Sequence, residues 1–431
     1  MAFVTRRTFF QGAAYAAAAT RVMGANDRVR VGIIGLGGRG QNHLSEFLRF
    51  PDSQVAALCD VNQPARERSQ AVVQRAGSPK AKEFVDMRKL FDDKEIDAVT
   101  MATPNHWHAL GTIWACQAGK DVYVEKPASH NIFEGNKMIE AARKNKRIVM
   151  VGMQSRSNAL KQQAMKLLHD GFIGKLYLAK GVCFKRRNTI GRTPQEPVPA
   201  GLDWDIFLGP APMRPYTKNR FAYNWHWFWD TGNGDIGNQG VHEMDICRWG
   251  FKNCGFPKTI YSTGGKYIYD DDQETPNTQY STFDYGDFQI HFEVRGILTG
   301  PEGGLPVKAG NTVGNLFYGS DGWMWIGDGG LHVYKGEKNE RVSLPPLPAE
   351  PKGAGEPHMQ NFLAAVRTRD AKLLTADVET GAISAALCHL ANISYRVGRK
   401  LTWDSKAGQF VNDAEADKLL TRDYRKPYVV A

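Results

Sequence analysis

Cysteine is scarce in this chain, and its spacing is irregular. The 431 residues contain six cysteines, and no two of them form a C-x-x-C pair. This pattern gives no support to a zinc site or a dense disulfide framework, and it is typical of cysteines that pack as small apolar side chains. His106 and His108 have a metal-like spacing, but no cysteine or carboxylate accompanies them at a fixed distance, so we expect no metal site.

Long hydrophobic runs and dense basic segments are also missing. No stretch of 18 apolar residues occurs, which argues against a membrane span. The formal net charge of +10 comes from dispersed lysines and arginines, and the densest cluster is Lys185–Arg187. Three residues are too few for a nucleic-acid-binding arm, so we expect no nucleic acid partner. The cluster indicates a solvated face, with a basic active-site rim for anionic sugars as the lesser alternative.

The N-terminus resembles a twin-arginine export signal. Thr5–Phe10 (TRRTFF) precedes an alanine-rich run at 13–19 and the small residues that follow Met23. Export signals of this type place paired arginines before a mildly hydrophobic segment. We therefore expect residues 1–27 to be a signal or arm and the protein to be exported, for example to the periplasm. A short amphipathic helix is the alternative, and Met23 leaves open whether a signal would be cleaved.

The chain beyond residue 27 is long enough for two domains, because one hydrophobic core stops growing at about 250–300 residues. Residues 28–34 (RVRVGII) predict a buried parallel strand, and 41–49 predict a helix. Between them lies G-x-G-x-x-G, whose glycines permit a tight turn, close approach of a pyrophosphate and packing of helix on strand. The residues of this turn that we expect at a bound dinucleotide are Gly35, Gly37, Gly38, Arg39 and Gly40.

Asp60 indicates which dinucleotide is bound. It ends a second predicted strand at 54–59, twenty residues after Gly40. An acidic side chain at this place accepts hydrogen bonds from the adenosine ribose and repels a 2′-phosphate. The sequence therefore favours NAD over NADP, although Arg39 and Arg66 leave NADP open.

Strands and helices continue in alternation, with strands at 96–101, 121–124 and 148–153 and helices at 109–118 and 132–145. This order is typical of a parallel α/β sheet, in which ligands bind beyond the carboxyl ends of the strands. Further cofactor contacts are expected from the residues that follow these strands, namely Thr103, Asn105, His108, Glu125, Lys126 and Gln154.

The motifs occur in the order and spacing of a known family. The glycine turn, Thr103–Asn105 (TPN), Glu125–Pro127 (EKP) and the glycine-rich segment 232–242 resemble the Gfo/Idh/MocA oxidoreductases over roughly residues 28–400. The resemblance implies that Lys126 orients the substrate oxygen and that His242 is the general acid/base. Oxidation of an alcohol suits this pair, because a near-neutral imidazole can take the hydroxyl proton and an ammonium can stabilise the developing oxyanion.

The chain departs from the family pattern at Asn238. Family dehydrogenases usually have an aspartate four residues before the histidine, and an amide cannot take its place as a proton acceptor. Asp235, Glu243 and Asp245 lie nearby in the sequence. The identity of the proton relay is therefore open.

The second half, residues 153–431, predicts an α+β domain after the Rossmann domain at 28–152. Strands expected at 176–184, 259–264, 279–285, 288–295, 315–318 and 323–326 follow one another without crossover helices, which favours a large open, mostly antiparallel sheet. Helices expected at 359–368 and 380–397 should return to the Rossmann unit. The resemblance implies that the exposed face of the sheet makes a homodimer or homotetramer.

Residues 223–230 (YNWHWFWD) have the most unusual composition in the chain. Aromatic faces stack on sugar rings and polar groups bind hydroxyls, so the segment predicts a carbohydrate or polyol site. A tryptophan-rich core corner or an oligomer contact is the alternative. The residues that we expect at the substrate are Arg156, Trp225, His226, Trp227, Asn238 and His242.

Three functions fit these features. The first is an NAD-dependent oxidoreductase acting on a sugar or polyol. The second is an NAD-dependent glycoside hydrolase that oxidises a ring carbon transiently, eliminates the aglycone and returns the hydride. The third, a sugar-binding protein with purely structural NAD, is disfavoured because Lys126 and His242 are both present.

Overall fold

The computed structural model describes residues 28–347 and 355–431, so the expected signal at 1–27 lies outside the described residues. The first half forms a six-stranded parallel sheet in the order β3-β2-β1-β4-β5-β6. Its strands are β1 (Val29–Ile34), β2 (Ser53–Cys59), β3 (Lys82–Phe84), β4 (Ala98–Met101), β5 (Asp121–Val124) and β6 (Val149–Val151). The order reverses between β1 and β4, and ligands of doubly wound sheets bind at such a switch point.

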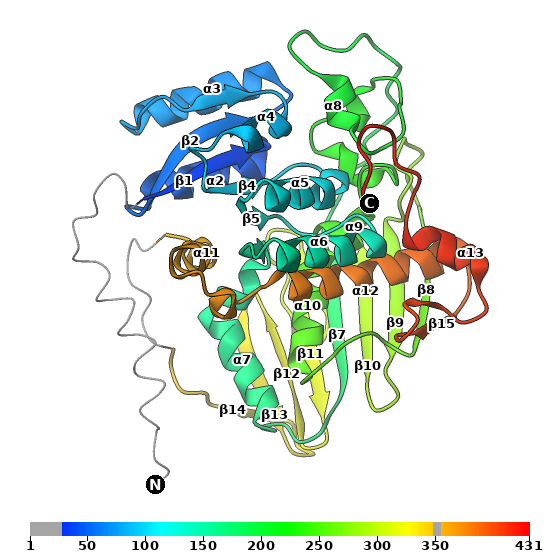
Figure 1. The fold of residues 1–431 in the computed structure, drawn as a ribbon. Coiled ribbons are helices and arrows are strands. Elements are labelled where there is room, and N and C mark those ends of the chain that lie inside the picture. Colours follow the sequence, from blue (N-terminus) through cyan, green and yellow to red (C-terminus); the bar gives the residue numbers. More distant parts are fainter. Residues whose placement is uncertain (1–27, 348–354) are drawn as a thin grey trace.

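Helices connect these strands, as Figure 1 shows. They are α2 (Gly38–Arg49), α3 (Gln63–Arg75), α4 (Met87–Asp92), α5 (Asn105–Gln117) and α6 (Ile132–Lys144). The expectation that the helix before β5 begins at 109 is wrong, because α5 already begins at Asn105. Pro104 precedes that helix with φ −58°, which is suited to a helix start. His106 and His108 therefore lie on a helix, and not in a loop.

The second half forms a ten-stranded sheet in the order β14-β13-β12-β11-β7-β10-β9-β8-β15-β16. Only the β7–β10 pair is parallel, which confirms the expected α+β fold with a large, mostly antiparallel sheet. The strands are β7 (Leu176–Phe184), β8 (Thr259–Gly265), β9 (Thr278–Asp284), β10 (Gln289–Arg295), β11 (Thr312–Gly319), β12 (Gly322–Gly327), β13 (Gly330–Lys335), β14 (Glu340–Val342), β15 (Leu401–Asp404) and β16 (Gln409–Phe410).

Helices pack against one face of this sheet and connect it to the Rossmann unit (Figure 1). Those on the sheet are α7 (Ala159–His169), α10 (Gly240–Gly250) and α12 (Val378–Val397), whereas α11 (Pro357–Thr368) packs near β5 of the Rossmann unit. The short helices are α8 (Trp204–Leu208), α9 (Gly234–Asn238) and α13 (Ala414–Asp417). Single 3₁₀ turns lie at η3 (Gln154–Ser157), η4 (Lys218–Arg220), η5 (Asn224–Trp227), η6 (Ala371–Leu373) and η7 (Lys418–Leu420). The helix α12 packs on α6 and β8 and so joins both halves, as expected. In the described part of the chain, no helix is long and apolar enough to cross a membrane.

An excursion between β7 and α9 reaches back over the Rossmann sheet. Its aromatic residues form a small core of their own that packs against Val61, at the carboxyl end of β2. The Trp107 indole on α5 donates to the carbonyls of Ile206 and Phe207, each at 3.0 Å. The second half therefore covers the edge of the sheet where a dinucleotide would lie.

Close packing of α2 on β1 depends on Gly40. A Cβ at Gly40 would overlap the carbonyl oxygen of Gly35, whereas a Cβ at Gly38 would meet nothing within 4 Å. We predict that Gly40→Ala lowers the free energy of unfolding by about 1–3 kcal/mol or more, the usual cost of overpacking. Gly38→Ala is the matched control and should unfold like the wild type. Urea unfolding of both variants measures this, and equal stability of the two would contradict it.

Candidate active site

The glycine turn forms an open cradle at the start of α2. Gly35 has φ +80° and lies against the main chain of Ala102, so no other residue fits there without strain. Gly37 and Gly38 face open space, and no side chain caps α2. The first N–H groups of a helix lack partners within it and attract anions. The turn therefore fits a pyrophosphate.

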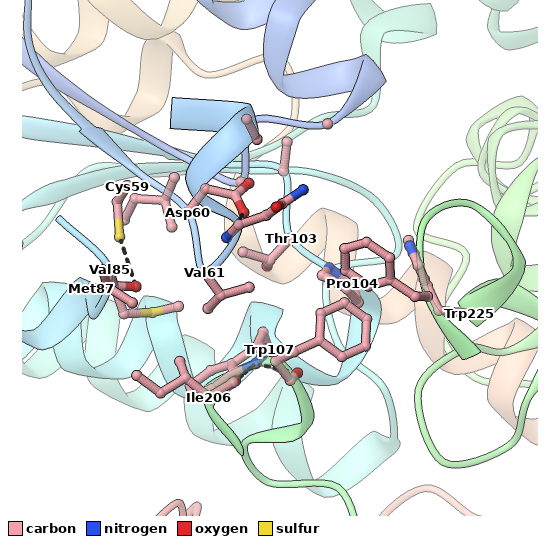
Figure 2. Close-up of a pocket in the computed structure, with 18 of the residues that line it drawn as sticks. Cys59, Asp60, Val61, Val85, Met87, Thr103, Pro104, Trp107, Ile206 and Trp225 are labelled. Atoms are coloured by element: carbon pink, nitrogen blue, oxygen red, sulfur yellow. Dashed lines mark hydrogen bonds between the residues drawn. The ribbon is translucent and has the colours of Figure 1, made fainter. Parts of the chain in front are cut away.

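A cavity opens beside this turn. Gly35, Gly37, Asp60, Thr103 and Pro104 line its Rossmann side. The excursion supplies the opposite wall, and Figure 2 shows Trp225 facing Pro104 across it. The apolar lining comprises Val61, Val85, Met87, Ile206, Phe207 and Phe221. A largely apolar cavity with a few polar groups is the usual form of a cofactor site.

Asp60 clamps the glycine turn to the end of β2. One of its carboxylate oxygens accepts from the Leu36 N–H at 2.6 Å and the other from the Asn62 N–H at 2.8 Å. Burial raises the pKa of Asp60, and these two hydrogen bonds oppose the rise. Asp60 also lines the cavity, where its remaining lone pairs can accept from ribose hydroxyls.

The arginines near Asp60 are arranged differently from the sequence-based expectation. Arg66 donates to the main-chain carbonyl of Asp60 at 2.6 Å, and Arg68, which sequence reasoning missed, lines the cavity. Arg39 instead binds Glu125 at the end of β5. It is therefore not directed at Asp60, where a 2′-phosphate would lie, and so gives no support to NADP.

The residues after β4 differ in their roles. Thr103 lines the cavity, and its hydroxyl has no partner among the described residues. Asn105 is buried and donates to the Asn233 side chain at 2.9 Å, which links the two halves. Both ring nitrogens of His108 lie within 3.0 Å of main-chain carbonyls, those of Thr103 and Pro127. The expected cofactor contact of His108 is therefore corrected to a positioning role.

Glu125 is the centre of a buried hydrogen-bond network. Its Oε1 lies 2.7 Å from Arg39 Nε, 3.0 Å from His43 Nε2 and 3.0 Å from Gln154 Nε2. Burial alone would raise the pKa of Glu125, but the Arg39 charge and the His43 hydrogen bond hold this pKa well below its usual value. Arg39, Glu125 and Gln154, all expected at the cofactor, thus bind one another and fix the turn that carries Lys126. The role of His43 in this network could not be predicted from the sequence, because a single histidine inside a helix belongs to no recognisable motif.

Lys126 and His242 come together from the two halves. The Lys126 ammonium donates to the Asn238 carbonyl at 2.6 Å and lies 3.5 Å from the Asn238 amide oxygen. Burial lowers the pKa of Lys126, although the Glu125 charge opposes this. Burial, and next the Lys126 charge, lower the pKa of His242 to about 3. In the described structure His242 Nδ1 is buried without a partner.

The carboxylates that might replace the missing aspartate are otherwise engaged. Asp245 is fully buried and bonds Arg156 at 2.8 Å. The expected substrate contact of Arg156 is therefore corrected to a buried ion pair. Asp235 pairs with Arg187 at 2.7 Å. Glu243 is buried beside the Gln239 amide, and its burial raises its pKa to about 7. None of the three has a hydrogen bond to His242 in the described part of the chain.

The side chains of the aromatic segment 223–230 lie in three different places: the wall of the dinucleotide cavity, the protein core and the side near Asn238. Trp225, expected at the substrate, lines the dinucleotide cavity and stacks on His226 with ring centroids 3.6 Å apart. Trp227, also expected there, is 4% exposed beneath Arg187 and belongs to the core. His226 is buried with Nδ1 against the Tyr223 carbonyl. Tyr223 is half exposed, and its hydroxyl accepts from the Asn238 amide at 2.9 Å. Sequence reasoning did not single out Tyr223.

The comparison with known families agrees with this geometry. The model of the oxidoreductase family with an NAD-binding Rossmann fold, GFO_IDH_MocA, matches residues 29–153, and the model of its C-terminal alpha/beta domain matches 162–254 and 327–430. The chain belongs to the Gfo/Idh/MocA oxidoreductase family. Because the cradle, Asp60 and the cavity fit a dinucleotide, it is an NAD-binding member.

Curated relatives include a glycosyl hydrolase family 109 protein of Saccharopolyspora erythraea, 27% identical over 217 residues, which are 49% of this chain and 42% of that protein. Glycosyl hydrolase family 109 protein 1 of Bacteroides thetaiotaomicron is 30% identical over 159 residues, 36% of this chain and 34% of the relative. The matched segments thus span less than half of these relatives.

Two solved structures show the same fold over most of the chain. The WlbA dehydrogenase from Bordetella pertussis, in complex with NADH and UDP-GlcNAcA, has a TM-score of 0.64 at 21% identity and covers 88% of this chain and 99% of its own. Levoglucosan dehydrogenase, in complex with NADH and L-sorbose, has a TM-score of 0.65 at 18% identity and covers 87% and 99%.

Asp60 should govern nucleotide affinity. We predict that Asp60→Ala weakens NAD binding about tenfold or more, because the charge-assisted hydrogen bond to the turn at Leu36 and the one to Asn62 after β2 are both lost, each worth about 1.5–3 kcal/mol. Calorimetric titration with NAD and NADP measures this. Asp60→Asn keeps an acceptor for one N–H, so its NAD affinity should lie between that of the wild type and that of Asp60→Ala. Wild-type affinity in Asp60→Ala, or equal affinity of the wild type for NAD and NADP, would contradict the assignment.

Proposed function

We propose that this protein catalyses NAD-dependent oxidoreduction at a carbinol carbon of a sugar or polyol. The observation that carries the proposal is that the Lys126 ammonium bonds the Asn238 carbonyl, four residues before His242, and that its charge acts on the His242 imidazole. The two sugar-bound relatives of the same fold, one with UDP-GlcNAcA and one with L-sorbose, support a carbohydrate substrate.

The protonation of these residues favours alcohol oxidation. Burial lowers the pKa of His242 to about 3, below the near-neutral value expected from the sequence. The imidazole is therefore a weaker base, but it is present at physiological pH in the neutral form that can accept the hydroxyl proton. The Lys126 ammonium stabilises negative charge on the same oxygen as the C–H bond breaks. Bound NAD⁺ supplies the hydride acceptor, so the alcohol loses one hydride and one proton and becomes a carbonyl.

A second candidate is an NAD-dependent glycoside hydrolase. The curated glycosyl hydrolase family 109 relatives favour it. The wall built by Ile206, Phe207 and Trp225 across the dinucleotide cavity also suits a cofactor that stays bound while the hydride leaves and returns. This route releases an aglycone without net NADH, whereas the dehydrogenase accumulates NADH.

The open face of the ten-stranded sheet suits a homodimer or homotetramer. One face of β7–β13 carries a row of partly exposed aromatic side chains that includes Tyr261, Tyr280, Tyr318, Trp323 and Tyr334. The ion pair of Lys180 and Glu293 lies between these aromatic side chains on the same face, and partly exposed aromatic surface favours association. We propose that two copies of the chain pair through this face. We also propose that the boundary between the two domains of each copy lies at about residue 152. Light scattering of the purified protein tests the oligomer.

We also propose export through the twin-arginine route, on the basis of Thr5–Phe10 alone. That route handles proteins already folded around a cofactor, which fits a resident NAD. Cell fractionation tests the proposal, and a protein confined to the cytoplasm would contradict it.

Lys126 and His242 should be needed for turnover and dispensable for NAD binding. We predict that Lys126→Ala lowers kcat about a hundredfold or more, as removal of a preorganised donor does, and that His242→Ala has an effect of similar size. NADH absorbance and aglycone release on a sugar and glycoside panel give the rates, and calorimetry gives NAD affinity. Wild-type rates in both variants would show that the catalytic assignment is wrong.

The pH dependence provides a further arm of this test. Since the lowered pKa of His242 keeps the base form present above about pH 3, kcat/KM should not fall on acidification from pH 7 to about pH 5. Asn238→Asp adds a negative charge beside Lys126, which should raise the pKa of both Lys126 and His242 and move the acid limb to higher pH. In Asn238→Ala, which adds no charge, the acidic side of the kcat/KM–pH profile should stay at the wild-type pH. An acid limb unchanged by Asn238→Asp would contradict this account.

A further inference from the structure

Two lysines converge on the end of α9, one helical turn before His242. The Lys126 ammonium donates to the Asn238 carbonyl at 2.6 Å, and the Lys185 ammonium donates to the Gln239 amide oxygen at 2.9 Å. Asn238 and Gln239 are neighbours in sequence, so the two positive charges lie at one place. Both acceptors are neutral, and no carboxylate lies within 4.0 Å of either ammonium among the described residues.

A third lysine adds to this positive charge. The Lys161 ammonium donates to the Ser155 hydroxyl at 2.8 Å, which is also neutral. Lys161 is close enough that its charge helps to lower the pKa of His242, after burial and the charge of Lys126. Glu243 and Asp328 share a hollow with Lys161, so part of its charge is balanced there. Lys126 feels only the more distant negative charges of Glu125 and Asp235, and neither Lys126 nor Lys185 forms an ion pair in the described part of the chain.

The nearby carboxylates do not neutralise these two lysines. Glu125 bonds Arg39, and Asp235 bonds Arg187 at two atoms. Asp245 bonds Arg156. Each of these acids is matched by an arginine. Glu243 has no cation within 4.0 Å in the described structure, and burial raises its pKa to about 7, so it carries only part of a charge at neutral pH.

The dinucleotide does not account for the lysines either. The anionic part of the cofactor fits the cradle at Gly37 and Gly38, and none of the three lysines lines the cavity beside that turn. Asn238, the residue that binds Lys126, is a neutral amide and adds no negative charge at this place. A buried or partly buried cation without a counterion is costly unless a ligand supplies the charge.

We propose that the substrate is an acidic sugar, whose carboxylate, sulfate or phosphate group binds beside Lys185 while the reacting carbinol lies at Lys126 and His242. This inference rests on the proposed function for the site and names its substrate class. Lys185 is then the residue that selects an anion, and Asn238 permits one because it adds no repulsion. Arg187 supports the site from behind through Asp235 and Tyr223.

Equilibrium binding tests the proposal independently of turnover. The full-length protein, loaded with NADH, is titrated by calorimetry with matched pairs: glucose and glucuronate, galactose and galacturonate, and glucose with its 6-sulfate and 6-phosphate. We expect at least one acid to bind about tenfold or more tightly than its neutral partner, as for one partly buried ion pair, and this ratio to fall with added salt. The separate arms show whether the anion is a carboxylate, a sulfate or a phosphate.

Variants assign the preference to Lys185. Lys185→Gln should bring the acid and the neutral sugar to equal affinity while NADH affinity and thermal stability stay at the wild-type value, and Lys185→Arg should keep most of the preference. Lys175→Gln removes the same charge from an exposed position and should change nothing. Neutral sugars that bind as tightly as their acids, acids that do not bind at all, or an unchanged ratio in Lys185→Gln would overturn the proposal.

The outcome separates this inference from the proposed function. If neutral sugars alone reduce bound NAD⁺, the oxidoreductase assignment stands and the acidic substrate is wrong. If acidic sugars bind through Lys185 but neither NADH nor aglycone appears, the anion site stands and the assigned activity is wrong.

Discussion

The buried carboxylate of Glu125 is the interaction on which the rest of the site depends. It brings together Arg39 and His43 of α2, Gln154 after β6 and, through its own main chain, Lys126. These residues come from three places in the Rossmann unit, namely the helix α2, the end of β5 and the turn after β6. A buried carboxylate of this kind is tolerated because several donors hydrogen-bond to it. Removal of one member of the network would leave buried polar or charged groups without a partner, which is costly. The position of the reactive ammonium relative to the nucleotide turn follows from this one group.

The second half completes the site by adding what the Rossmann unit lacks. It contributes the base His242, the acceptor Asn238 for Lys126 and the wall that faces the dinucleotide. Burial makes His242 a neutral base, and the nearby ammonium keeps it so. Because Asn238 is an amide and not a carboxylate, it adds no negative charge beside Lys126 at the point where substrate would bind. The same residue therefore bears both on proton transfer and on the choice of substrate.

Much of the fold could be predicted because the signals are local. Strand β5 and strand β7 have the predicted limits, since β-branched residues and flanking glycines mark them in sequence. The strands β14 and β16 were missed because they have only three and two residues, and β13 and β15 were not singled out although each alternates apolar and polar side chains. The start of α5 was missed because its first turn, Asn105–His108, reads as a loop after a strand, although tertiary contacts bury it.

The site was predictable only where a motif carries it. Lys126 and His242 belong to recognisable segments, and the structure places them together. The partners of Arg156 and His108 depend on contacts between residues far apart in the chain, so their roles as a buried ion pair and as a bridge between carbonyls could not be read from spacing. Lys185 appeared only as part of a basic triplet. Its significance depends on the neutral partner that the fold gives it.

The most direct measurement is an NAD titration of Glu125→Gln, a variant of the same shape that removes the charge and replaces one acceptor oxygen with an amide donor. The account predicts that the variant folds, with unchanged far-UV circular dichroism, but unfolds at a lower temperature and binds NAD at least tenfold more weakly, because Arg39 and the glycine turn lose their counter-charge. A Glu125→Gln protein with wild-type thermal stability and wild-type NAD affinity would contradict the claim that this carboxylate organises the site.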